Sequence, residues 1–113
     1  MKSHKELKDA YKQMKFPMGV FQIKNVSNNR VFVDSSTDMV SKWNRHKTEL
    51  RFGGHRNKEL QRDWKEYGES NFVFEILTEL KPSEGQNGSY TRELKLLETL
   101  ILEELGLPEG MKY

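Results

Sequence analysis

Two short apolar runs joined by a turn constrain the fold of this chain more than any other feature. The runs cover Val20–Lys24 and Arg30–Val33, and both are rich in residues that favour strands. Between them, the pair Asn28-Asn29 suits the positive backbone φ that tight turns require. The pattern predicts a β-hairpin, whose strands are antiparallel, so a wholly parallel sheet is excluded.

The rest of the chain alternates predicted helices with one further strand. Helices are expected where apolar residues recur at helical spacing behind a capping residue, and they stop at glycine or proline. The predicted elements are a helix over 4–15, the hairpin, a helix over 38–50 capped by Ser35, Ser36 or Thr37, a helix to Tyr67 capped by Asn57, a strand over 71–77, a loop over 81–89 and a helix from Ser89 or Thr91 to Leu105. This order predicts an α+β fold with a three-stranded antiparallel sheet flanked by helices, and an extra N-terminal helix.

Length and composition predict one domain over residues 1–113. A chain of 113 residues with 35% apolar residues can build one modest core. There is no run of 18 apolar residues and no apolar leader, so neither a membrane span nor a secretory signal is expected. The chain has no cysteine, which excludes disulfides and thiolate metal sites and is compatible with the cytoplasm.

Charge is distributed unevenly along the chain. Residues 1–65 carry a net charge of +8, whereas residues 66–113 carry −6. Between Lys42 and Lys65 the cations are interleaved with Trp43, Phe52 and Trp64. Such a stretch is typical of a surface that faces phosphate groups, although a solvated basic face without a partner fits the same pattern.

The last predicted helix carries a glutamate inside an apolar stripe. Leu94, Leu97, Ile101 and Leu105 are expected to face inward, with Glu98 between them on the same side. A carboxylate there needs a cation, a metal ion or a proton, because an unpaired buried charge is strongly destabilising. Two interpretations stay open: Glu98 reaches the surface and pairs with a lysine, or it binds a metal ion in a catalytic site.

Lys42 and His46 are one helical turn apart, so their side chains point the same way beside Trp43. A cation and an imidazole directed at one place suit phosphate chemistry, in which negative charge grows on phosphorus oxygens while water loses a proton. An ordinary solvated helix face would carry the same residues.

Several segments together resemble the GIY-YIG endonuclease family, in its homing-endonuclease branch. The segments are Gly19–Asn25, Arg30–Ser36, Lys42–His46, Leu50–His55, Asn57–Trp64, Tyr67–Leu77 and the pair Leu97-Glu98. The resemblance covers about residues 18–105, so residues 1–17 are left as the N-terminal helix and 18–105 as the nuclease-like domain.

The resemblance implies hydrolysis of a DNA phosphodiester with one divalent ion, usually Mg²⁺ or Mn²⁺, held by Glu98. It aligns the two motif tyrosines with Phe21 and Phe32, the catalytic arginine with Lys42, and the glycine of the second motif with Asp34. Phenylalanine keeps the aromatic volume without the hydroxyl, and lysine keeps the charge without the bidentate fork.

Other side chains are candidates to take over proton transfer. They are His46 and the hydroxyl groups of Ser35, Ser36 and Tyr90. The chain is therefore either a weak metal-dependent DNA endonuclease or a non-catalytic nucleic-acid-binding module that retains the fold. Under either interpretation the residues expected to face DNA phosphates are Arg45, Lys47, Arg51, His55, Arg56, Lys58 and Arg62. Sequence specificity is expected to be low or supplied by a partner.

Overall fold

A computed structural model describes residues 17–81 and 90–113 of the chain. The helix predicted over 4–15 and nearly all of the loop predicted over 81–89 lie outside the described residues. The described part contains three strands, three α-helices and two short 3₁₀ turns, η1 (Glu69–Asn71) and η2 (Glu109–Met111).

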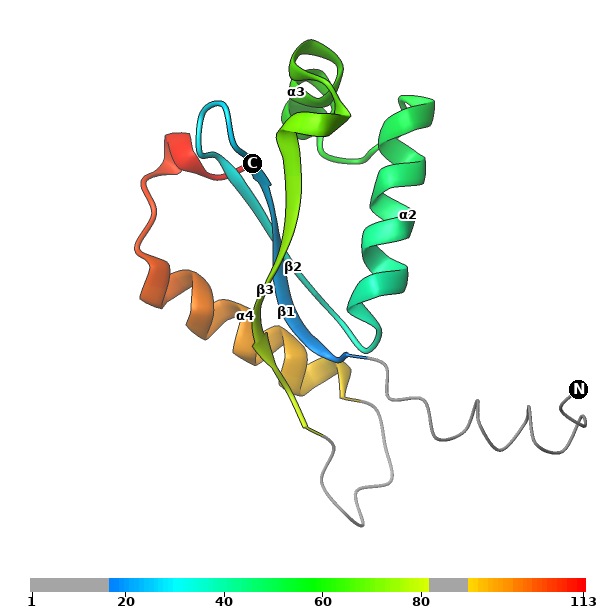
Figure 1. Cartoon of the computed structure of the whole chain (residues 1–113). Coiled ribbons are helices and arrows are strands. Elements are labelled where there is room, and N and C mark those ends of the chain that lie inside the picture. Colours follow the sequence, from blue (N-terminus) through cyan, green and yellow to red (C-terminus); the bar gives the residue numbers. More distant parts are fainter. Residues whose placement is uncertain (1–16, 82–89) are drawn as a thin grey trace, which may run out of the picture.

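The strands form one antiparallel sheet. They are β1 (Gly19–Asn25), β2 (Val31–Ser36) and β3 (Phe72–Glu79), in the order β2-β1-β3. β1 pairs with both neighbours in the antiparallel sense, and the hairpin turn holds Asn29 at a φ of 63°. The predicted α+β fold, with a three-stranded antiparallel sheet and flanking helices, is confirmed (Figure 1).

Three helices flank the sheet: α2 (Met39–Phe52), α3 (Lys58–Tyr67) and α4 (Thr91–Leu105). Asn57 caps α3 as predicted, because its side chain accepts from the Leu60 backbone N–H at 3.0 Å. The predicted cap of α2 was wrong, since Asp38 accepts from the Ser41 N–H at 3.1 Å. None of the helices in the described ranges has the length and apolar character needed to cross a membrane.

The core lies between one face of the sheet and the pair α2 and α3. Its buried residues are Phe21, Ile23, Met39, Leu50, Leu60, Trp64 and Phe72. Trp43 closes the side of this core by stacking on Phe74, with ring centroids 5.8 Å apart and planes 15° apart. Burying a large apolar side chain contributes about 1.5–3 kcal/mol, so this cluster is the main source of stability in the described residues.

The inward stripe predicted for α4 is only partly correct. Leu94 is buried, and Leu97 and Ile101 are half-buried, but Leu105 is 39% exposed. Leu105 is the last residue of α4, whose C-cap is Gly106.

The C-terminal residues close one end of the hairpin, a feature that the sequence did not predict. The Tyr113 backbone N–H donates to the Val31 carbonyl at 2.9 Å. The Tyr113 hydroxyl donates to Asp63 Oδ2 of α3 at 2.6 Å, and the Arg30 guanidinium lies 4.3 Å from the centre of its ring. Burial, followed by the bond to Asp63, raises the pKa of Tyr113 to about 12. Three separate segments are thereby joined through one side chain.

Candidate active site

The hairpin presents its aromatic residues and one carboxylate on the same face of the sheet. Phe21 lies opposite Asp34, and Ile23 lies opposite Phe32, in the register of β1 and β2. Because side chains two residues apart share a face, Phe32 and Asp34 both face α2 together with Phe21. Phe21 is fully buried, Phe32 is half-buried and Asp34 is only 4% exposed.

Helix α2 brings Lys42 and His46 onto this face. The His46 ring meets Phe32 edge to face, with centroids 5.3 Å apart, and lies 6.1 Å from the Phe21 ring. Lys42 Nζ is 4.0 Å from Asp34 Oδ2, and its side chain is 29% exposed. The structure therefore brings together Phe21, Phe32, Lys42 and His46, four of the residues that the sequence nominated.

A directional chain of hydrogen bonds runs through the two buried histidines. The Asn57 backbone N–H donates to His55 Nδ1 at 3.0 Å. Because Nδ1 accepts, the proton of a neutral His55 lies on Nε2, which is 2.8 Å from His46 Nδ1. His46 in turn carries its proton on Nε2 and donates it to Asp34 Oδ2 at 2.8 Å. Both nitrogens of His46 are thus occupied inside the protein.

The protonation states in this chain follow from burial and hydrogen bonding. Burial raises the pKa of Asp34, but the bonds from His46 and the Ser35 N–H and the charge of Lys42 outweigh it, and the pKa is lowered from 3.8. Burial, followed by the neighbouring His46, lowers the pKa of His55 from 6.5. Near neutral pH, Asp34 is therefore a carboxylate and His55 a neutral imidazole.

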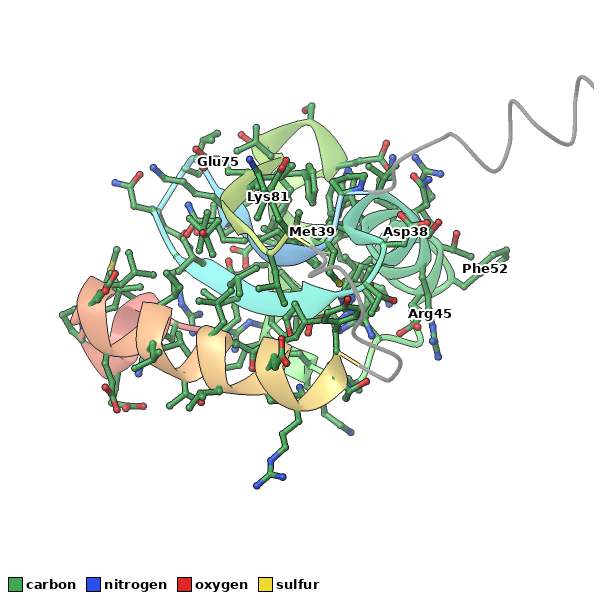
Figure 2. All side chains as sticks on the ribbon, turned by 90° about the horizontal axis from the view of Figure 1, so that it is seen from below. Asp38, Met39, Arg45, Phe52, Glu75 and Lys81 are labelled. Atoms are coloured by element: carbon green, nitrogen blue, oxygen red, sulfur yellow. The ribbon has the colours of Figure 1, made fainter. Side chains whose placement is uncertain are left out.

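Glu98 lies on α4, which packs on β1 and β2 from the other side of the sheet than α2 (Figure 1). The structure therefore does not bring Glu98 into contact with Lys42 or His46 in the described residues. In Figure 2, α4 runs alongside β2, which is an edge strand of the sheet. The Glu98 side chain is 17% exposed, and its Oε2 is 3.9 Å from Lys95 Nζ. Within residues 17–81 and 90–113, no group of three or more histidine, cysteine, aspartate or glutamate side chains is arranged to hold a metal ion.

The basic residues expected to face DNA divide into two groups. Arg45, Arg51, Arg56, Lys58 and Arg62 are exposed and Lys47 is half-buried, all on α2, α3 or the segment between them. Arg45 points away from the sheet and pairs with Glu49 at 3.1 Å (Figure 2). His55 is different, since it is only 6% exposed and both of its ring nitrogens bond inside the protein.

The sequence nominated His46, but it predicted neither Asp34 nor His55 as a partner of that side chain. The hairpin register held a usable signal, because Asp34 is two residues from Phe32 and must share its face. No sequence signal places His55 against His46, since the contact depends on how the segment between α2 and α3 folds back.

The chain was compared with known proteins. No protein-family profile matches it. The intron-associated endonuclease 1 of Enterobacteria phage T4 is 42% identical over 62 residues, which are 55% of this chain and 25% of the relative. The catalytic domain of the homing endonuclease I-TevI is 30% identical and superposes with a TM-score of 0.69, over 85% of this chain and 95% of that domain. The chain belongs to the GIY-YIG endonuclease family.

A second structure supports the same membership. A point mutant of the catalytic domain of intron endonuclease I-TevI is 28% identical, with a TM-score of 0.71 over 87% of this chain and 92% of that one. This GIY-YIG chain spans a quarter of the length of the phage relative.

Proposed function

We propose that this chain is the catalytic domain of a GIY-YIG nuclease that hydrolyses a DNA phosphodiester bond, with weak activity. The observation that carries the proposal is its similarity to the catalytic domain of a homing endonuclease over 95% of that domain. The cluster of Lys42, His46 and Asp34 on β2 and α2 provides polar groups at the place where the family motifs lie.

Two side chains would hold the charged groups of the reaction. Lys42 is partly exposed and can place its ammonium against the scissile phosphate, where negative charge develops. Glu98 would hold a divalent cation such as Mg²⁺ or Mn²⁺. Among the described residues its carboxylate makes a single, long ion pair, with Lys95, and Mg²⁺ is often bound through one carboxylate while it keeps several waters, so the donor set fits. Such an ion would supply charge neutralisation at the phosphate oxygens.

The arrangement also explains why weak activity is expected. Phe21 and Phe32 have no hydroxyl group, and both nitrogens of His46 are occupied by His55 and Asp34. No nitrogen of His46 is therefore free to accept a proton directly from the attacking water. General-base catalysis typically contributes about 10²–10⁴ in rate, and much of that factor is expected to be missing.

A second candidate is a DNA-binding module that no longer cuts. The burial of Phe21 and the two occupied nitrogens of His46 favour it, because neither of these two side chains is then poised for proton transfer. The basic surface of α2 and α3 would serve such a module equally well.

Nicking of supercoiled plasmid, with Mg²⁺ and with Mn²⁺, separates the two candidates. We expect slow nicking by the wild type and a loss of about 100-fold or more in Glu98→Gln. Glu103→Gln is the matched control, since Glu103 is an exposed carboxylate on the same helix. No nicking by the wild type, or equal nicking by all three proteins, would leave only the binding module.

DNA binding is tested separately by its dependence on salt. If Arg45, Lys47, Arg51, Arg56, Lys58 and Arg62 contact phosphates, the logarithm of the association constant should fall with log salt by about 0.9 per contact. Arg56→Gln with Lys58→Gln should reduce that slope by about two contacts. A slope near zero for the wild type contradicts the phosphate-facing surface.

Restoring the motif residues tests whether the site lost only its reactive groups. The triple variant Phe21→Tyr, Phe32→Tyr and Lys42→Arg should nick faster than the wild type if the backbone still holds these positions for catalysis.

A further inference from the structure

Asp34 is the point at which the two α2 side chains of the site meet. Its Oδ2 accepts from His46 Nε2 at 2.8 Å and lies 4.0 Å from Lys42 Nζ. Its Oδ1 accepts from the Ser35 backbone N–H at 2.8 Å. The Asp34 side chain is only 6% exposed, and a carboxylate buried to this extent is tolerated because it accepts two hydrogen bonds and lies beside the cation of Lys42.

The three partners are not equivalent. If His46 and His55 are neutral, as their hydrogen-bond directions require, Lys42 supplies the positive charge that balances Asp34. Lysine has a flexible stem and a point charge, so its ammonium has no preferred direction without a fixed anion nearby. Asp34 is fixed by Ser35 and His46, and it can therefore restrict where the Lys42 ammonium lies.

We propose that Asp34 is a positioning residue of the phosphodiester site, which, together with His55, holds His46 in its Nε2–H tautomer and restrains the Lys42 ammonium beside β2. The part that concerns catalysis rests on the proposed nuclease function, whereas the tautomer and the ion pair do not. Asp34 occupies the position that the resemblance aligns with a motif glycine, so this restraint is a property of this chain and not of the shared motif.

Two variants separate the two contacts. Asp34→Asn keeps the volume and one acceptor oxygen for His46, but it removes the charge opposite Lys42 and the acceptor for the Ser35 N–H. Asp34→Ala removes all three contacts. Glu75→Gln is the control for a lost negative charge, because Glu75 accepts from Gln22 at 3.2 Å, on the face of the sheet opposite Phe21 and Asp34.

The tautomer is read by ¹⁵N NMR of the imidazole rings at neutral pH. The wild type and Asp34→Asn should show His46 protonated at Nε2 with a slowly exchanging N–H. Asp34→Ala should lose that protected signal. Retention of the same tautomer and the same protection in Asp34→Ala would overturn the assignment to Asp34.

The restraint on Lys42 is read by a double-mutant cycle. Asp34→Asn should lower the nicking rate at saturating DNA by roughly 10- to 100-fold, as expected for a misplaced catalytic group, with little change in the half-saturating DNA concentration. In a Lys42→Met background the same change should have no further effect, because Asp34 acts through Lys42. A faster Asp34→Asn variant, or an undiminished loss in the Lys42→Met background, would contradict the proposal.

Failure of the nuclease function can be distinguished from failure of this proposal. If the wild type does not nick at all, the same cycle is measured on the urea midpoint of unfolding. Non-additive effects of Asp34→Asn and Lys42→Met support the ion pair there, and strictly additive effects remove it.

Discussion

The hydroxyl group of Tyr113 joins three parts of the fold, so its removal should destabilise the protein far more than one oxygen atom suggests. It donates to Asp63 Oδ2 at 2.6 Å and accepts from Asn25 Nδ2 at 3.2 Å. Asn25 is fully buried at the end of β1, and Asp63 on α3 is 3% exposed. Tyr113→Phe retains the ring that lies over Arg30 and deletes the bonds to Asp63 and Asn25.

The magnitude follows from the two partners left behind. A hydrogen bond to a charged group contributes about 1.5–3 kcal/mol, and a buried donor left without a partner costs about 1–3 kcal/mol. Asp63 keeps its hydrogen bond from Asn28 at 3.3 Å and its ion pair with the Arg30 guanidinium at 3.8 Å, and these contacts reduce the loss of stability. We therefore expect the free energy of unfolding to fall by about 2–3 kcal/mol, which corresponds to roughly 10–20 °C in Tm for a domain of this size.

Urea unfolding followed by tryptophan fluorescence measures this change directly. Tyr67→Phe is the matched control, because Tyr67 is 38% exposed at the end of α3 and its change should stay within about 0.5 kcal/mol. DNA affinity per folded molecule should be the same in both variants. A loss below about 0.5 kcal/mol in Tyr113→Phe would mean that water replaces the hydroxyl and that the C-terminal contact is not a structural link.

Three further outcomes are expected. Gly19→Ala should destabilise by about 3 kcal/mol, because its Cβ would lie 2.1 Å from the Thr78 carbonyl oxygen, whereas Gly54→Ala, which meets nothing within 4 Å, should be nearly neutral by the same denaturation. Folding lowers the pKa of His55, so as the pH drops the unfolded chain binds a proton before the folded protein does. The stability that depends on a neutral His55 should therefore be fully present above about pH 6.5 and should decrease below it. Urea midpoints of unfolding from about pH 7.5 to 5 measure this decrease. Phe21→Tyr alone should lower the unfolding free energy by about 1–3 kcal/mol, because the new hydroxyl enters a fully buried position, and a neutral effect would reveal a polar partner there.

The fold followed from the sequence because its signals were local. The hairpin, the Asn57 cap and the third strand depend on residues close in the chain, and the structure places all three as predicted. The cap of α2 was missed because Asp38 competes with Ser36, whose hydroxyl instead accepts from the Asp38 backbone N–H at 3.0 Å. Neighbouring capping residues of similar strength cannot be ranked by pattern alone.

The site was harder to predict because its contacts are distant in sequence. Lys42 and His46 were nominated from their spacing on one helix. Asp34 and His55 contact His46 because of the hairpin register and the turn after α2, neither of which the helical spacing describes. The same holds for Tyr113, which meets Asp63 across 50 positions. Periodicity describes which face a residue occupies, and it carries no information about the partner that the face will meet.

Asn57 links the histidine pair to the beginning of α3. Its side chain accepts from the Leu60 N–H, while its own backbone N–H donates to His55 Nδ1. A proton added to His55 Nδ1 would make that nitrogen a donor facing another donor, the Asn57 backbone N–H. The two groups would repel each other, so the first turn of α3 would have to move. Lys58 and Arg62 extend from this helix. Protonation of His55 would thus shift the helix that carries these two cations, and any binding of phosphate groups to them would then depend on pH.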